Sequence, residues 1–187
     1  MKRLFIALPI QESTRKQITG ILTEESFRKL PVRWTSLQNL HLTLQFLGDV
    51  NEKRIPDLKQ ILNRIHVPGK PEPLHFTTVG SFPDSAHPRI IWLGIDRAES
   101  LIRIHQQITA DLTRNGFEAD RKPFKAHLTL GRIKEGCTTG NIIVSSVQKR
   151  FDTAAVDDSP MENVVLFESL LKPGSPIYTS VYTRTLI

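Results

Sequence analysis

The tetrapeptide His-Leu-Thr-Leu occurs twice in this chain, at residues 41–44 and again at residues 127–130. Side chains on a β-strand alternate between its two faces, so the histidine and threonine of each copy share one face and the leucines share the other. Residues two apart on one face lie about 7 Å apart, a separation that one phosphate group can bridge. Each copy therefore predicts half of a binding site for a phosphate-sized anion.

Two such half-sites facing each other would place His41 and His127 on opposite sides of the anion, with the hydroxyls of Thr43 and Thr129 donating hydrogen bonds to its oxygens. An unperturbed imidazole has a pKa of about 6.5, so one can be neutral while the other is protonated. The neutral ring would take a proton from the attacking oxygen, and the charged ring would protonate the departing oxygen. The pair predicts metal-free phosphodiester cleavage; the alternative is two unconnected histidines on ordinary edge strands.

Arg132 follows the second copy in the stretch HLTLGR. Strict alternation would place Arg132 on the face opposite His127, but Gly131 is a natural position for a β-bulge that would turn Arg132 back toward the anion. A solvated surface arginine is the alternative. Further basic residues flank the motif and could steer a polyanion inward, namely Arg121, Lys122, Lys125 and Lys134.

The charge balance favours a polyanionic partner. Lys and Arg number 25 against 19 Asp and Glu, which gives a net charge of +6 and favours nucleic acid or phosphorylated ligands. The single cysteine, Cys137, excludes an internal disulfide and a multi-cysteine zinc site. The other four histidines lack the spacings of zinc sites, so we predict no metal: His66, His75, His87 and His105.

The order of the expected elements indicates an α+β fold with antiparallel sheets, because strands and helices are mixed without regular βαβ alternation. Strands or extended segments are expected at 2–8, 33–47, 73–82, 89–95, 152–157, 162–171 and 177–186, besides the second tetrapeptide. Helices are expected at 11–29, 55–65 and 139–150, and from 101 to an end near Asn115 and Gly116, with a turn at Gly48, Asp49 and Asn51. Each tetrapeptide strand precedes a helix, so we expect two lobes of similar plan, related by a rough twofold, within one domain spanning residues 1–187.

No apolar run approaches the roughly 18 residues of a membrane span. The apolar run near the N-terminus, LFIALPI, is interpreted as the first core strand and not as a signal peptide, because polar residues follow it without a cleavage pattern. We therefore expect a cytoplasmic protein without a membrane partner, and a monomer.

Longer stretches around the motifs resemble the two-histidine phosphoesterase superfamily, specifically the RNA 2′,3′-cyclic phosphodiesterases also called 2′-5′ RNA ligases, its LigT-like branch. They are RLFIAL, VRW, NLHLTLQFLGDV, PRIIWLG, KPFKAHLTLGR and LFESLLKPGSPIYTSV, which together cover essentially the whole chain. The resemblance implies a bilobal fold with a central groove between two antiparallel sheets, each backed by helices on the outside. It also implies hydrolysis of RNA 2′,3′-cyclic phosphate ends to 2′-phosphomonoesters, in which one of His41 and His127 activates water and the other protonates the leaving 3′-oxygen. Thr43, Thr129 and Arg132 would hold the phosphoryl oxygens.

The chain has no GxxxxGK[ST] phosphate loop, so we predict no cofactor and no ATP site. RNA ligation by such a protein would instead be ATP-independent, with a 5′-hydroxyl replacing water at the strained cyclic phosphate. Phe46 could stack on a nucleobase, whereas Trp34 is expected in the core. Two other functions stay open: a noncatalytic module that binds RNA ends or nucleotides, and a phosphodiesterase for small cyclic nucleotides.

Overall fold

The computed structural model describes residues 1–96, 99–120, 123–172 and 175–186. Its strands are β1 (Lys2–Pro9), β2 (Val32–Trp34), β3 (His41–Val50), β4 (Phe76–Phe82), β5 (Ile90–Ile95), β6 (His127–Ile133), β7 (Asn163–Leu170) and β8 (Ile177–Thr185). Its α-helices are α1 (Glu12–Leu22), α2 (Glu25–Arg28), α3 (Ile55–Asn63), α4 (Glu99–Arg114) and α5 (Gly140–Asp152). The prediction of an α+β fold is confirmed.

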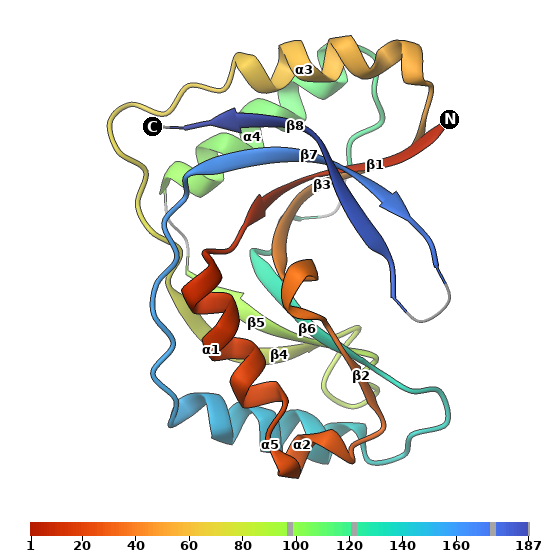
Figure 1. Ribbon diagram of the computed structural model, residues 1–187, viewed down its shortest axis with the longest axis vertical. Helices are drawn as coiled ribbons and strands as arrows, with labels where there is room; N and C mark the ends of the chain where they lie inside the picture. Colours follow the sequence, from red (N-terminus) through yellow and green to blue (C-terminus); the bar gives the residue numbers. More distant parts are fainter. Residues whose placement is uncertain (97–98, 121–122, 173–174, 187) are drawn as a thin grey trace.

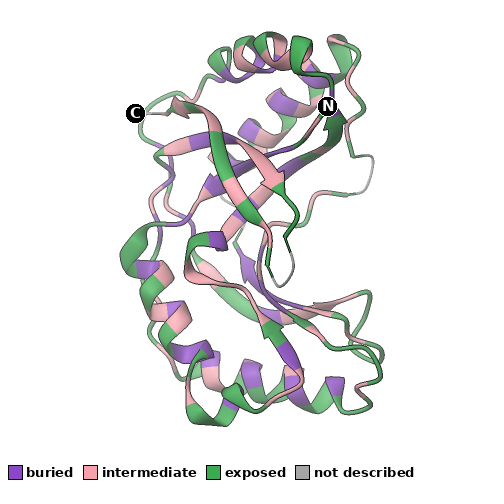
Figure 2. Cartoon of the chain, turned by 45° about the vertical axis from the view of Figure 1, so that its right-hand side comes forward, coloured by how far each residue is buried: buried purple, intermediate pink, exposed green. Residues whose placement is uncertain are grey.

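The longer helices form because their apolar residues recur every three or four positions and so lie on one face. In α4 the buried face consists of Leu101, Ile104, Ile108 and Leu112. The central strands are continuous apolar runs, and the residues of β1 from Leu4 to Leu8 are all buried. Figure 2 shows the result, with buried positions on the inward faces of the helices and along the central strands.

All strand pairs are antiparallel, and within the described residues the strands form one sheet in the order β4-β5-β6-β3-β1-β7-β8, with β2 pairing with β6. The two expected sheets are thus joined at the centre, where β3 and β6 share the register pair Leu42 and Leu128. On one side of this junction, β3, β1, β7 and β8 carry α3 and α4; on the other, α1 and α5 lie with β2, β4, β5 and β6 (Figure 1).

The strands of the two sides are interlaced along the chain. β1 pairs with β3 from its own end of the sequence and with β7 from the other end. In the same way β5 pairs with β6, which follows it, and with β4, which precedes it. Neither half of the sequence therefore supplies all the strands of one side.

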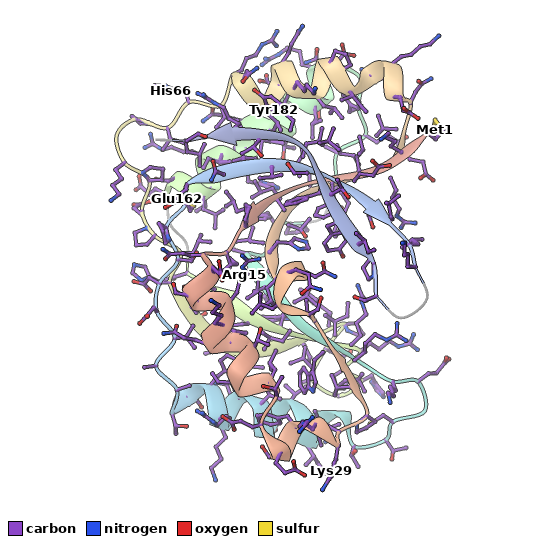
Figure 3. The ribbon with its side chains drawn as sticks, in the orientation of Figure 1. Met1, Arg15, Lys29, His66, Glu162 and Tyr182 are labelled. Carbon is purple, nitrogen blue, oxygen red and sulfur yellow. The ribbon has the colours of Figure 1, made fainter. Side chains whose placement is uncertain are left out.

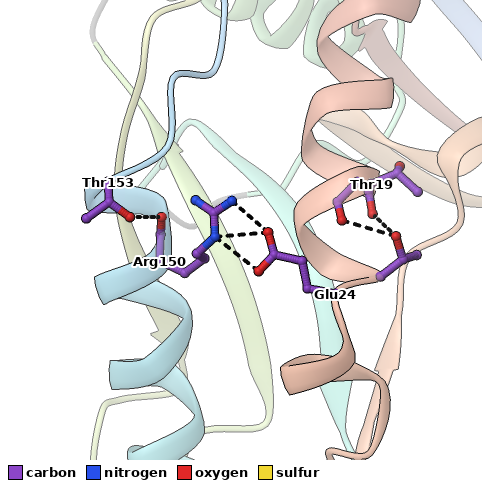
Figure 4. A network of polar contacts seen from close by, with 6 residues as sticks. Thr19, Glu24, Arg150 and Thr153 are labelled. Carbon is purple, nitrogen blue, oxygen red and sulfur yellow. Dashed lines mark hydrogen bonds and ion pairs between the residues drawn. The ribbon is translucent and has the colours of Figure 1, made fainter.

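Side-chain contacts fasten the helices to each side. On the first, the Tyr182 hydroxyl of β8 donates a hydrogen bond to Asn63 at the end of α3, and Figure 3 shows Tyr182 beside that helix. On the second, the Arg150 guanidinium of α5 donates to both carboxylate oxygens of Glu24, at distances of 2.6 to 3.1 Å (Figure 4). Glu24 lies between α1 and α2, so the ion pair holds the helical break against α5.

Three expected elements differ from the structure. The helix expected at 11–29 is divided into α1 and α2, because the chain turns at Thr23 and Glu24. The extended segment 33–47 is interrupted by a 3-10 turn at Leu37–Asn39, and β3 continues to Val50 through the expected turn. The strand predicted at 152–157 is wrong: α5 extends to Asp152 because Phe151 packs into the core, and the following residues form no strand.

Candidate active site

The two tetrapeptides lie side by side at the junction of β3 and β6. Leu42 and Leu128 are register partners and completely buried. Positions flanking an antiparallel pair face each other in reverse order, so this register aligns His41 with Thr129 and Thr43 with His127 on the opposite face of the strands. The structure thus brings together the four residues that the repeat predicted, and each of them is half-buried.

Both imidazoles are fixed in the same tautomer by the backbone. The Nδ1 atom of His41 lies 2.7 Å from the carbonyl oxygen of Asn39, and the Nδ1 atom of His127 lies 2.7 Å from that of Lys125. Because a carbonyl oxygen only accepts hydrogen bonds, each Nδ1 carries a hydrogen and Nε2 is the nitrogen left for proton transfer. In His41 this Nε2 lies 3.1 Å from the Thr43 hydroxyl.

His41 lies in an aromatic environment built by three strands. Its ring centroid is 5.0 Å from that of Phe5, 6.3 Å from that of Phe167 and 5.2 Å from that of Tyr178, which meets it edge-on. Burial among these rings lowers the pKa of His41 to about 4, with a smaller lowering from the charge of His127. The charge of one imidazole therefore acts on the pKa of the other across the junction.

His127 has a different setting. Its ring meets Phe82 edge-on at 5.1 Å between centroids, and Trp92 lies at 6.2 Å. Lys125 places its ammonium 4.0 Å from the centre of the Trp92 ring. Burial lowers the pKa of His127, and the charge of Lys125 lowers it further, while the hydrogen bond to the Lys125 carbonyl acts in the opposite direction.

The expected bulge at Gly131 is present. Ile91 pairs with Gly131, but Trp92 pairs with Thr129, so Leu130 is an extra residue in β6. Leu130 and Gly131 are both buried and Arg132 is exposed, which returns Arg132 to the face of His127 and Thr129. Burial raises the pKa of Tyr178 and the charge of Arg132 opposes this rise, so Arg132 is electrostatically coupled to a residue of the opposite side.

The first tetrapeptide contains the same irregularity, which sequence reasoning did not detect. Ile6 pairs with Gln45 and Ala7 with Thr43, so Leu44 is the extra residue in β3. Phe46 therefore occupies the position equivalent to Arg132 and is 65% exposed, on the face that Phe5 shares with His41. Trp34 packs against the core, as predicted.

Other expected contributors are less closely placed. Lys134 is exposed, while Arg121 and Lys122 lie outside the described residues. Sequence reasoning also missed Tyr178 and Asn39, the residue whose carbonyl orients His41. The Asn39 side chain is buried and donates a hydrogen bond to the Pro176 carbonyl at 2.9 Å, which anchors the connection from β7 to β8. Tyr178 lies in a stretch that carries the family resemblance, LFESLLKPGSPIYTSV, but only the folded strands reveal its contact with His41.

Within the described part of the chain, no three His, Cys, Asp or Glu side chains come close enough together to hold a metal ion. In the same ranges, none of the helices combines the length and the apolar character needed to cross a membrane.

A sequence model described as LigT-like phosphoesterase matches this chain twice, over residues 8–92 and over residues 93–178. Each match contains one tetrapeptide, in agreement with the predicted duplication. A relative from Archaeoglobus fulgidus named RNA 2′,3′-cyclic phosphodiesterase is 32% identical over 94% of this chain and 96% of its own. A relative of the same name from Thermotoga maritima is 31% identical over 96% of this chain and 93% of its own.

Solved structures agree with this assignment. TT0787 of Thermus thermophilus is 26% identical with a TM-score of 0.78, covering 98% of this chain and 97% of its own. The apo form of LigT from E. coli has the same fold, with 24% identity and a TM-score of 0.75 over 99% of this chain and 97% of its own. With a repeated family match over most of its length, the chain belongs to the LigT-like phosphoesterase family.

Proposed function

We propose that this protein hydrolyses the 2′,3′-cyclic phosphate at an RNA end to a 2′-phosphomonoester, with His41 and His127 as its acid and base. One observation carries the proposal. On the paired strands β3 and β6, each imidazole donates a hydrogen bond from Nδ1 to a backbone carbonyl, which leaves both Nε2 atoms for proton transfer. The named activity of the relatives from Archaeoglobus fulgidus and Thermotoga maritima supports the same reaction.

The proposed reaction is an in-line displacement at phosphorus. A neutral imidazole accepts a proton from water through Nε2 as the water oxygen forms a bond to phosphorus. The bond from phosphorus to the ribose 3′-oxygen breaks, and the other histidine, protonated at Nε2, gives its proton to that oxygen. The product carries its phosphate on the 2′-oxygen, and the two histidines have exchanged protonation states.

Thr43, Thr129 and Arg132 would stabilise the charge that develops on the phosphoryl oxygens. The register aligns each threonine with the histidine of the other strand, so hydroxyl donors flank the anion on both sides. The bulge turns Arg132 onto this face, where a guanidinium can donate two parallel hydrogen bonds to a phosphate. Positioned donors of this kind act on the transition state, where the charge is largest.

Phe46 would bind the base of the terminal nucleotide. The phenyl ring of Phe46 is 65% exposed, so a nucleobase stacked on it would bury apolar surface of the ring. Every base has a π-face that can stack in this way. The bulge at Leu44 places this ring on the same face as His41 and Thr43. Stacking there would orient the ribose with its cyclic phosphate toward the histidines.

The direct test is turnover of an RNA oligonucleotide that ends in a 2′,3′-cyclic phosphate, with the position of the product phosphate mapped. We expect conversion to the 2′-phosphate by the wild type and none by His41→Ala or His127→Ala. His87→Ala, which removes an exposed histidine, is the matched control and should retain full activity. A folded wild type without turnover would favour a noncatalytic binding module.

Removal of divalent metal should leave this turnover unchanged, because the proposed proton transfers need only the two imidazoles. The measurement is the rate of cyclic phosphate hydrolysis before and after treatment with EDTA. A rate that falls with EDTA and returns with added metal would disprove the metal-free reaction.

A further inference from the structure

A second cationic side chain lies directly beside Arg132. Strand β2 pairs with β6 so that Arg33 is the register partner of Arg132, and both side chains are exposed. Register partners in an antiparallel pair lie on the same face, with Cβ atoms about 5 Å apart. The neighbours of Arg33 confirm this orientation: a Cβ placed on Gly131 would meet Val32 and Trp34, so those two side chains lie on the buried face and Arg33 on the other.

This arginine pair has no acidic partner in the described ranges, since no carboxylate there lies within ion-pair distance of either guanidinium. Some arginines elsewhere have such partners, as with Arg54 and Asp57 or Arg150 and Glu24, while others, such as Arg64, have none among the described residues. Like charges directly opposite each other on neighbouring strands repel, and an anion bound between them removes the repulsion. What distinguishes Arg33 and Arg132 is that they are register partners, so one anion from solution can contact both guanidinium groups.

The position of the pair relative to the histidines indicates which anion. Two strands pair with β6 one after the other: β3 pairs with it at Leu128, next to His127, and β2 pairs with it further along, at Arg132. A strand of RNA that left the histidine pair along this edge of β6 would reach Arg33 beyond the phosphate held by Arg132. The terminal nucleotide of an RNA is linked at its 5′ side by a phosphodiester, whereas a nucleoside 2′,3′-cyclic phosphate has no second phosphate.

We propose that Arg33 binds the phosphodiester on the 5′ side of the terminal nucleotide and so favours RNA ends over small cyclic nucleotides, a proposal that rests on the function proposed above. Arg132 serves the reacting phosphate, and Arg33 serves its neighbour. The pairing of β2 with β6 places Arg33 beside Arg132 and so makes the protein prefer an RNA end over a mononucleotide.

The test compares two substrates that differ by one phosphodiester: a nucleoside 2′,3′-cyclic phosphate and a dinucleotide with a 5′-hydroxyl that ends in the same group. We expect Arg33→Ala to raise KM for the dinucleotide about tenfold. It should leave kcat for the dinucleotide, and both constants for the mononucleotide, unchanged within about twofold, since in this proposal Arg33 contacts the neighbouring phosphodiester and not the reacting phosphate. Arg33→Lys should restore part of the loss, and Arg64→Ala, an equal charge change at the exposed end of α3, should have no effect.

A dinucleotide whose internal linkage is a neutral methylphosphonate separates charge from general contact. The wild type should bind it as weakly as Arg33→Ala binds the natural dinucleotide, and Arg33→Ala should cause no further loss. Equal losses on the mononucleotide and dinucleotide, or no loss on either, would overturn the role of Arg33.

Binding of a fluorescent RNA with a 3′-terminal phosphate gives a readout that does not require turnover. Arg33→Ala should weaken this binding and reduce its logarithmic dependence on salt by about 0.7, the value for one contact to single-stranded nucleic acid. If the wild type hydrolysed no cyclic phosphate, the proposed function would fail. The salt dependence would then still show whether Arg33 contacts RNA, and an unchanged slope would refute the contact.

Discussion

At the scale of single residues, the two histidines make the same kind of hydrogen bond to a backbone carbonyl but differ in their surroundings. His41 has Phe5 and Tyr178 against its ring, whereas His127 has the ammonium of Lys125 close by. The repeat predicted both histidines and both threonines because strand parity depends on sequence alone. It could not predict Tyr178, since the contact with His41 depends on the order in which distant strands join the sheet.

The lowered pKa of His41 should make the fold sensitive to acid. Between pH 6.5 and about 4, His41 is protonated in the unfolded chain and neutral in the folded protein. The unfolded state then binds more protons, so this contribution to stability is complete above 6.5 and falls with decreasing pH. From pH 7 to pH 4.5 the free energy of unfolding should lose about 2.5 kcal/mol through this one group.

Urea denaturation of the wild type and His41→Gln at pH 7 and 4.5 measures that contribution. The loss on acidification should be about 2.5 kcal/mol smaller in His41→Gln. His87→Gln, at an exposed position, should lose as much as the wild type. Identical losses in all three proteins would mean that His41 titrates normally in the fold.

Arg132 should affect turnover without affecting the fold, because its side chain is exposed. We expect Arg132→Ala to lower kcat about a hundredfold, the scale of losing one donor to a transition-state oxyanion. Arg132→Lys should recover only part, because an ammonium cannot make the paired contact of a guanidinium. The readouts are steady-state kinetics and thermal melting; an unchanged rate would identify Arg132 as an ordinary surface residue.

At the scale of elements, the two bulges determine which side chains reach the site. Each follows a threonine by one residue, at Leu44 and Leu130, and each turns the residue two positions further on to the histidine face. Gly131 made the second bulge predictable, because glycine often marks such irregularities. Gln45 occupies the equivalent position in β3 and gives no such signal; its side chain is buried and bonded to Thr109.

Gly131→Ala should damage both stability and activity. A Cβ at this position would lie 2.8 Å from side-chain atoms of Trp34 and Val32 and 3.0 Å from the Arg33 carbonyl, so β2 would have to shift. We expect a loss of about 1 to 3 kcal/mol in the free energy of unfolding, together with a lower kcat. Chemical denaturation and kinetics measure both effects.

The control for this substitution is Gly20→Ala in α1, where a Cβ would meet nothing within 4 Å. It should stabilise the protein by about 0.5 to 1 kcal/mol, since alanine is the better helix former. If Gly131→Ala behaved like this control, the close approach of β2 would not matter.

Local patterns failed where packing overrode them. The segment 152–157 contains residues typical of strands, but Phe151 completes the apolar face of α5 and extends the helix to Asp152. The hydroxyl of Thr153 then donates to the Arg150 carbonyl at 3.0 Å, which ends the helix without starting a strand. Whether such a segment becomes helix or strand is decided by packing against neighbours that are remote in the sequence.

At the scale of the whole molecule, the interlaced strands lead us to propose that the chain folds as one cooperative domain. β7 completes the side that β1 and β3 begin, and β4 lies with β5 and β6 on the other. Duplication was predictable from the repeat, and the double family match agrees with it, while the approximate twofold stays a prediction. The exchange of strands was not predictable, because either pairing would bury similar apolar surfaces.

Loss of packing on one side should therefore destabilise the other. Leu58 is fully buried in α3, on the side of β1 and β7, while Trp34 and Trp92 belong to strands of the opposite side. Leu58→Ala should lower the free energy of unfolding by about 2 to 5 kcal/mol. Tryptophan fluorescence and far-UV circular dichroism should shift to the same lower denaturant midpoint, and separate midpoints would show two independent units.

The strand exchange also bears on descent. Two identical copies of a single repeat, each lending strands to the other, would form a symmetric dimer with its twofold axis between the two tetrapeptides. In such a dimer every substitution near one histidine would appear near the other. Once joined in one chain, the copies could diverge, and they have done so at Phe46 and Arg132, the equivalent positions after the bulges. One chain can therefore offer an aromatic ring on one side of the site and a cation on the other, which a symmetric dimer could not do.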